Sequence, residues 1–107
     1  MTEQIGLPAS ISERDFQDRV VELARLRRWL VYHTHDSRRS DPGFPDLVMV
    51  RGGVLVFAEL KSQKGRTTLA QREWLLGLDG VGRTSYEVVK VHVWRPADWP
   101  QIVEVLT

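Results

Sequence analysis

The chain has 107 residues, of which 42% are hydrophobic and 27% charged, and its formal net charge is +1. These proportions are ordinary for a soluble globular protein, and the length favours a single domain. The near-neutral charge argues against a generically basic nucleic-acid binder, so any contact with nucleic acid must use local positive charge. The lack of cysteine excludes a disulfide framework, a zinc ribbon and a thiol nucleophile.

The distribution of apolar residues gives no sign of membrane insertion. No apolar run reaches the length of a transmembrane helix, and the first residues lack the basic and then apolar pattern of a signal peptide. We therefore expect a soluble, cytoplasmic protein with no membrane partner. One domain is expected over residues 12–107, preceded by a loose lead-in over residues 1–11.

A first helix is expected from Ser12 to about Arg28. Ser12 is a good N-cap, and acidic residues follow it in the first turn. Most charged side chains, including Arg14, turn away from one apolar stripe made of Phe16, Val20, Leu23 and Ala24. Glu13 lies at the top of this stripe, where it either compensates the helix dipole or points toward a site, and the spacing leaves both open. Gln17, one turn later, is a weaker candidate for the same site.

Residues 29–34 form a short apolar segment that is typical of a strand. The connection that follows, residues 35–45, holds two prolines, a glycine and two arginines. Long connections in compact domains are often functional. We therefore favour phosphate contact for Arg38 and Arg39, while solvated charge balanced by neighbouring aspartates is the alternative.

Residues 43–61 contain the most informative pattern, a strongly apolar β-hairpin with charged groups at its base. Residues 47–50 and 54–58 are almost continuously apolar, and two glycines between them make a two-residue hairpin loop. That loop fixes the register, so counting back along both strands places Asp46 opposite Glu59. Both faces of the hairpin are apolar, so we expect it to be central in its sheet and covered on both sides.

The charged groups at the base of the hairpin share one face. Lys61 lies two residues beyond Glu59 and therefore projects to the same side of the strand. Two carboxylates forced together beside a core repel each other, and a divalent cation is the usual way to neutralise them. The alternative is an ordinary salt bridge between Glu59 and Lys61, with Asp46 in a simple turn. That alternative does not explain why the two carboxylates face each other.

A polar loop and a second helix follow the hairpin. Thr68 and Gln71 fit a capping box, and we expect the helix to run to about Leu78 and to end at Asp79-Gly80. Directly after the two carboxylates, where a phosphodiester would lie, the chain carries local positive charge. The residues are Lys61, Lys64, Arg66 and Arg72. The residue pattern itself predicts Gln71 as the capping partner of Thr68, which leaves its side-chain amide open to a second role.

The C-terminal part predicts a strand over residues 85–95 and a last helix capped by Asp98, with Pro100 in its first turn. The element order is then helix, three strands, helix, strand, helix, which implies a mixed sheet with helices on its faces. Core packing is expected for three tryptophans: Trp74, Trp94 and Trp99. The histidines do not supply enough ligands for zinc, and a structural role is expected for His33, His35 and His92.

The charged motif at the base of the hairpin is similar to that of a known family. Pro45-Asp46 followed by Glu59-Leu60-Lys61 resembles the PD-(D/E)xK nuclease signature. A narrower resemblance, to the VRR-NUC (virus-type replication-repair nuclease) branch, lies in three stretches: Gly43-Phe44-Pro45-Asp46-Leu47, Phe57-Ala58-Glu59-Leu60-Lys61 and Gln71-x-x-Trp74. The resemblance implies an α/β fold with an αβββαβ restriction-endonuclease-like core, a mixed sheet flanked by helices, and here an extra C-terminal helix.

The resemblance also implies a site and an activity. We expect a metal-dependent, structure-selective DNA endonuclease that hydrolyses phosphodiester bonds in branched DNA, such as Holliday-junction-like or flap substrates. Asp46, Glu59 and the backbone carbonyl of Leu60 would hold Mg²⁺ or Mn²⁺, since these ions prefer hard oxygen ligands. Lys61 would act on the attacking water or on transition-state charge. Glu13 would bind a second metal, and Gln71 would lie beside the first.

Further implications concern partners and alternatives. The basic residues outside this site would contact the DNA backbone: Arg38, Arg39, Lys64, Arg66 and Arg72. Small stand-alone relatives from phages and bacteria act on junctions as homodimers, so a homodimer is implied, in the host cytoplasm if the gene belongs to a phage. The alternatives are an inactive module that binds branched DNA or a partner protein, and an RNA nuclease.

Overall fold

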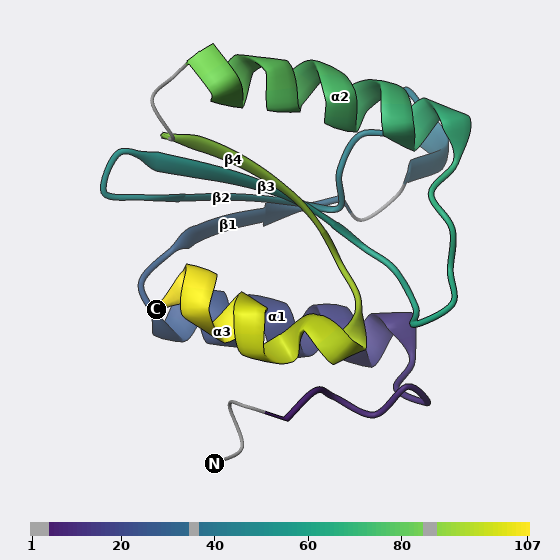
Figure 1. Cartoon of the computed structure of the whole chain (residues 1–107), viewed down its shortest axis with the longest axis vertical. Helices are drawn as coiled ribbons and strands as arrows, with labels where there is room; N and C mark the ends of the chain where they lie inside the picture. The colour runs from purple at the N-terminus through teal and green to yellow at the C-terminus, as the bar shows by residue number, and fades with distance from the viewer. Residues whose placement is uncertain (1–4, 35–36, 85–87) are drawn as a thin grey trace.

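The structure, a computed structural model, describes residues 5–34, 37–84 and 88–107 (Figure 1). In chain order the elements are α1 (Glu13–Leu26), β1 (Leu30–His33), the 3₁₀ turn η2 (Ser37–Arg39), β2 (Leu47–Arg51), β3 (Val54–Leu60), α2 (Leu69–Thr84), β4 (Val89–Trp94), the 3₁₀ turn η3 (Pro96–Asp98) and α3 (Trp99–Leu106). This confirms the expected order of helix, three strands, helix, strand, helix. None of the helices in the described ranges has the length and apolar character that a membrane crossing requires.

The four strands form one mixed sheet in the order β1-β2-β3-β4. β1, β2 and β3 pair antiparallel, and β4 pairs parallel to β3 because α2 carries the chain back across the sheet. In the hairpin Arg51 pairs with Val54 and Leu47 pairs with Ala58, which confirms the predicted register. Gly52 and Gly53 have φ values of 55° and 80°, as the tight turn between right-twisted strands requires.

Helices cover both faces of the sheet, but unequally. α1 and α3 lie on one face and α2 lies on the other (Figure 1). The α1/α3 face holds the main core, whose fully buried members include Phe16, Val20, Leu47, Met49, Val56, Ile102 and Leu106. α2 packs mainly against β4, so Val50 on β2 is 42% exposed and Leu30 on β1 is 75% exposed. The hairpin is central in the sheet, but the expectation that both of its faces are covered is wrong for the α2 side.

α1 follows the predicted pattern and ends slightly earlier than expected. The hydroxyl of Ser12 accepts a hydrogen bond from the backbone N–H of Asp15 at 3.0 Å. The helix buries Phe16 and Val20 on the expected stripe. It stops at Leu26, and Arg28 adopts a φ of 70°, so the backbone turns toward β1 before the predicted end.

The second helix, α2, ends later than predicted. The helix does not stop at Asp79-Gly80 but continues to Thr84. Within it Arg83 donates a hydrogen bond to the carboxylate of Asp79 at 3.1 Å, one turn apart. A β-carbon on Gly82 would lie 2.6 Å from the carbonyl oxygen of Val89, so the helix approaches β4 closely there. Packing on the sheet therefore outweighs the local tendency of glycine to end a helix.

The last strand and helix lie where the sequence predicted them, but their bounds and capping differ from the prediction. The predicted strand 85–95 is observed as Val89–Trp94, and residues 85–87 lie outside the described ranges. Asp98 stands at the N-cap position of α3, with Pro100 in the first turn as expected. However, its carboxylate does not cap α3, because it accepts a hydrogen bond from the backbone N–H of Arg95 at 2.8 Å.

The predicted core packing of the tryptophans holds for two of three residues. Trp94 is 3% exposed and Trp99 is 9% exposed, in agreement with the prediction. Trp74 is 39% exposed on α2, so the prediction of core packing is wrong for this residue. Its ring instead contacts Phe44 edge-to-face, with the ring centroids 5.1 Å apart.

Candidate active site

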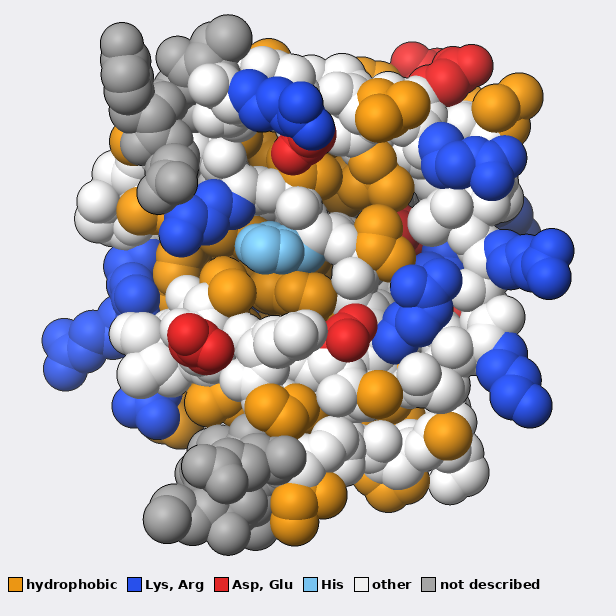
Figure 2. Space-filling view, in the orientation of Figure 1, with side chains coloured by type: hydrophobic (Ala, Val, Ile, Leu, Met, Phe, Trp, Pro, Cys, Tyr) orange, Lys and Arg blue, Asp and Glu red, His pale blue; other side chains and the backbone are white. Residues whose placement is uncertain are grey.

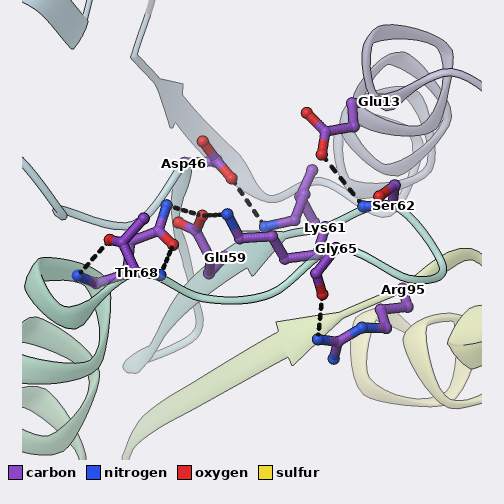
Figure 3. A network of polar contacts seen from close by, with 10 residues as sticks. Glu13, Asp46, Glu59, Lys61, Ser62, Gly65, Thr68 and Arg95 are labelled. Atoms are coloured by element: carbon purple, nitrogen blue, oxygen red, sulfur yellow. Dashed lines mark hydrogen bonds and ion pairs between the residues drawn. The ribbon is translucent and has the colours of Figure 1, made fainter.

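A cavity of about 280 Å³ opens at the C-terminal end of β3. Its walls come from α1, from the entry to β2, from the end of β3 and from the first turn of α2. The lining residues are Glu13, Arg14, Gln17, Asp46, Glu59, Leu60, Lys61 and Gln71. All six residues that the motif and its resemblance assigned to catalysis or metal binding therefore lie around one cavity, and Figure 3 shows four of them, labelled, in a single polar network.

Asp46 and Glu59 are brought together by the hairpin register. The pair lies one step beyond Leu47 and Ala58, the last residues that pair across the two strands. The carboxylate of Asp46 accepts a hydrogen bond from the backbone N–H of Leu60 at 2.8 Å, which ties the entry of β2 to the end of β3 (Figure 3). The predicted opposition of the two acidic residues is therefore part of the sheet itself.

Glu59 is 2% exposed, which is rare for a charged side chain. Its Oε2 accepts a hydrogen bond from the side-chain amide of Gln71 at 2.8 Å and lies 3.7 Å from the ammonium of Lys61. Its Oε1 is buried and has no hydrogen-bond partner among the described residues. A buried carboxylate oxygen without a partner carries a desolvation cost that a bound cation or water would relieve.

The electrostatics of the carboxylate pair follow from burial and proximity. Burial, with a further contribution from the charge of Asp46, raises the pKa of Glu59 from 4.5 to about 7. Burial also raises the pKa of Asp46, although the hydrogen bond from Leu60 and the charge of Lys61 oppose that shift. Near neutral pH the two carboxylates therefore compete for a proton, because the single ammonium of Lys61 does not offset their burial and mutual repulsion.

Gln71 forms the capping box that its position predicted and also contacts Glu59. Its side-chain oxygen accepts from the backbone N–H of Thr68 at 2.8 Å, and the Thr68 hydroxyl accepts from the backbone N–H of Gln71 at 3.1 Å. These two bonds form the capping box of α2. The side-chain amide of the same residue holds Glu59, so the start of α2 and the carboxylate are fixed relative to each other.

The contribution of α1 is larger than the sequence indicated. Glu13 lines the cavity, and its carboxylate accepts a hydrogen bond from the backbone N–H of Ser62 at 3.2 Å (Figure 3). Gln17 lines the cavity one turn later. Arg14 also lines it, although the apolar stripe placed this residue on the outer face. Its spacing of three from Gln17 was the available signal, because residues three apart share a helix face.

The donor set partly fits a divalent cation. Asp46 and Glu59 supply hard oxygens, and Oε1 of Glu59 lacks a hydrogen-bond partner within the described ranges. Among those same residues, no group of three or more histidine, aspartate or glutamate side chains is close enough to hold a metal ion. A cation at this position would therefore take two carboxylates together with backbone carbonyl and water oxygens, as Mg²⁺ often does.

The predicted nucleic-acid contacts do not line this cavity. Arg38 and Arg39 lie in η2, Lys64 and Arg66 lie between β3 and α2, and Arg72 lies in α2; all five are exposed. In Figure 2, lysine and arginine side chains are spread around the rim of the face shown, with acidic side chains between them. Contact between these basic residues and nucleic acid stays a prediction.

Two histidines are placed away from the cavity. His92 stacks on Trp94 with ring centroids 5.1 Å apart, and burial lowers its pKa. His33 ends β1, and His35 lies outside the described residues. The side chains that build the candidate site are therefore carboxylates, one lysine, two glutamines and one arginine, together with Leu60.

Comparisons with protein-family models, with curated proteins and with solved structures found no match to this chain. The functional argument therefore rests on the motif, on its position in the sheet and on the contacts in the cavity.

Proposed function

We propose that the protein is a metal-dependent phosphodiesterase, specifically a DNA endonuclease of the PD-(D/E)xK type. One observation carries the proposal: a carboxylate pair, in which Glu59 is buried and has an unsatisfied oxygen, shares a cavity with a lysine whose side chain is 14% exposed. The mixed sheet, with the pair at the end of two central strands, supports a restriction-endonuclease-like core. The VRR-NUC resemblance of the sequence is the second support.

Five residues of the cavity have a defined task at the first cation in this proposal. Asp46, Glu59 and the backbone carbonyl of Leu60 hold Mg²⁺ or Mn²⁺, which would supply Lewis-acid activation of water and neutralise charge on the phosphate. Gln71 fixes the orientation of Glu59 through its 2.8 Å hydrogen bond. The ammonium of Lys61, 3.7 Å from Glu59, donates to the attacking water or to a phosphate oxygen.

The protonation of the pair sets the conditions for cation binding. Because the pKa of Glu59 is about 7, the carboxylate is partly protonated in neutral solution without a cation. A cation binds the ionised form, so its affinity rises with pH and its binding releases protons. Glu13, which is held 3.2 Å from the N–H of Ser62, is placed to accept a second cation at the opposite wall.

The substrate in this proposal is branched DNA, with flap and Holliday-junction-like forms first. This rests on the VRR-NUC resemblance of residues 43–47, 57–61 and 71–74. The exposed basic residues in η2, in the loop after β3 and at the start of α2 would hold the phosphate backbone. A homodimer would present two such sites to paired strands.

Cleavage of labelled DNA tests the proposal. Four-way junction, flap and linear duplex are incubated with Mg²⁺, Mn²⁺ or EDTA, beside Asp46→Asn and Lys61→Ala. We expect metal-dependent cleavage that falls by at least ~100-fold in both variants, because removing one catalytic group typically costs this much. Lys90→Ala serves as the matched control, since Lys90 is exposed on β4 and does not line the cavity.

The other outcomes separate the alternatives. Full activity in Asp46→Asn or Lys61→Ala contradicts the assigned site. Tight junction binding without cutting in either metal favours an inactive binding module. Neither binding nor cutting of DNA directs the same assay to RNA substrates.

A further inference from the structure

A second cavity, of about 270 Å³, lies beside the candidate active site. Its walls come from the end of β1, from the loop after η2 and from α2. The side chains that line it are Tyr32, Thr34, Ser40, Asp41, Phe44 and Trp74. Its volume is just below the ~300–1000 Å³ that is usual for drug-sized ligands, so it suits a single heterocycle. We call it the aromatic cavity.

The aromatic cavity and the candidate active site take different residues from the same two segments, the entry to β2 and the start of α2. Gly43 lines the aromatic cavity, and three residues later Asp46 lines the catalytic cavity. Gly43 has a φ of 95°, and a β-carbon there would lie 2.4 Å from the carbonyl carbon of Ala70, so this segment is pressed against the first turn of α2. On α2, Gln71 faces the catalytic cavity and Trp74, one turn on, faces the aromatic cavity. A ligand that spans both cavities crosses only this segment.

Two of the three aromatic side chains that line this cavity are exposed. Trp74 is 39% exposed and Tyr32 is 63% exposed, whereas Trp29, Trp94 and Trp99 are all 9% exposed or less. Trp74 is held in a defined orientation, because Phe44 contacts it edge-to-face and in turn contacts Phe57 with ring centroids 6.0 Å apart. A fixed, exposed aromatic ring at a hollow is a stacking surface that loses little entropy on binding.

The polar groups in the aromatic cavity fit the edge of a base and disfavour a phosphate. Thr34, Ser40 and Asp41 supply hydroxyl and carboxylate groups that donate to or accept from a heterocycle. The carboxylate of Asp41 repels a phosphate, and no lysine or arginine is among the described residues that line the cavity. Aromatic walls with a few polar groups are the chemistry by which proteins bind unstacked bases.

We propose that the aromatic cavity binds one unpaired nucleobase of the strand whose phosphodiester lies at the candidate active site. The inference rests on the proposed function for the presence of a nucleic acid, and it adds a physical basis for substrate selection. A base inside a duplex must be unstacked before it can enter, whereas a base at a branch, flap or single-stranded end enters without that cost. The cavity therefore favours cleavage next to unpaired nucleotides.

Fluorescence of Trp74 tests binding without requiring catalysis. Of the four tryptophans, all within the described ranges, Trp74 alone is substantially exposed, so quenching reports a ligand bound next to Trp74, and the Tyr32 variant shows whether that ligand occupies the aromatic cavity. The full chain is titrated in EDTA with oligothymidylate and with an abasic oligomer of the same length and charge. We expect quenching by oligothymidylate and much weaker quenching by the abasic oligomer. The Trp74→Phe variant, which keeps an aromatic ring, should lose the signal and retain binding measured by anisotropy.

Variants of the stacking residues give the expected size of the effect. Trp74→Leu and Tyr32→Leu should each weaken oligothymidylate binding by ~5- to 150-fold, the loss typical of removing one base–aromatic stack. Tyr32 is 63% exposed, so its variant keeps the fold if Trp74→Leu does not. Leu76→Ala is the matched control, because Leu76 is 74% exposed on the same helix and does not line the aromatic cavity.

The outcomes separate this inference from the proposed function. Equal quenching by both oligomers, or unchanged affinity in Tyr32→Leu and Trp74→Leu, overturns the base-binding cavity even if the protein cuts DNA. Base-dependent quenching that is lost in the variants supports the cavity even if no substrate is cut. Where cleavage occurs, a flap with an abasic residue next to the cut should be cleaved more slowly than the normal flap by wild type, and equally by Trp74→Leu.

Discussion

At Glu59 the fold and the proposed chemistry favour opposite ionisation states of one carboxyl group. The strand places its side chain almost out of solvent, while catalysis requires an ionised carboxylate that holds a cation. The structure offers it one hydrogen bond, from Gln71, and a lysine at 3.7 Å, and leaves Oε1 without a partner in the described part of the chain. A proton or a cation must supply the remaining interaction.

The stability of the protein should therefore depend on pH through Glu59. Its pKa is about 7 in the folded state and 4.5 ordinarily, so between these values the folded state binds more protons than the unfolded state. The free energy of unfolding then falls as pH rises, and the contribution, present in full below pH ~4.5, is lost above pH ~7. Its size is on the order of 3 kcal/mol. Glu59→Gln should remove this dependence, which urea unfolding at pH 5 and pH 8 in EDTA measures.

Two comparisons make the pH test specific. Glu104→Gln, at an exposed position on α3, should keep the pH dependence of the wild type. Saturating Mg²⁺ at pH 8 should stabilise the wild type, by ~2.7 kcal/mol at 100 times its Kd, and leave Glu59→Gln much less affected. A Glu59→Gln variant with the wild-type pH dependence would show that the burial of Glu59 is not its cause.

At the scale of elements, α2 connects the parts of the molecule that bear on function. Its first turn holds Glu59 through Gln71, its second turn places Trp74 in the aromatic cavity, and its last turn packs on β4 at Gly82. The close approach of Gly82 to Val89 exists because the helix continues past Asp79-Gly80. Local sequence disfavours that continuation, and contact with the sheet supports it.

Two glycines of α2 should respond oppositely to alanine. Gly80→Ala adds a β-carbon with no atom within 4 Å, so it should stabilise the protein by ~0.5–1 kcal/mol through reduced freedom of the unfolded chain. Gly82→Ala places the same β-carbon 2.6 Å from the carbonyl oxygen of Val89 and should destabilise the protein by ~1–3 kcal/mol. Urea unfolding of both variants measures the difference, and stabilisation by Gly82→Ala would contradict the close approach of α2 to β4.

At the scale of the whole molecule, Arg51 connects the tip of the hairpin to α1 and α3, the two helices that cover one face of the sheet. Its guanidinium donates to the carbonyl of Arg27 at 2.9 Å, and to the carbonyls of Leu106 and Thr107, each at 3.1 Å. The same group lies 4.5 Å from the centre of the Trp29 ring. One side chain thus ties β2 to the ends of α1 and α3.

Replacing Arg51 should change stability without changing catalysis. Arg51→Lys keeps the charge but loses the planar group that reaches three carbonyls, so we expect destabilisation of ~1–3 kcal/mol. Glu59 lies five residues along β3 from the hairpin turn, or about 17 Å, so kcat for DNA cleavage at 25 °C should stay at the wild-type value. Urea unfolding and the cleavage assay provide the two measurements. A large loss of kcat in a folded variant would show that the contacts of Arg51 are not independent of the candidate active site.

The sequence by itself determined the order of the elements, the hairpin register and six residues of the candidate site. These depend on local rules: a two-residue glycine loop and the alternation of side chains place Asp46 against Glu59, and a capping box places Gln71 at the start of α2. The five basic residues predicted to hold nucleic acid were not brought to the cavity, because composition shows positive charge but not where an exposed side chain lies.

Only the tertiary structure decided the end of α2, the exposure of Trp74 and the existence of the aromatic cavity. Each depends on contact between segments far apart in the chain. Gly82 meets Val89 across the edge of the sheet, and Gly43 meets Ala70 where the loop is pressed against α2. Periodicity reports which side of one element faces the core. It carries no information about which second element stands opposite, and the cavities form between such elements.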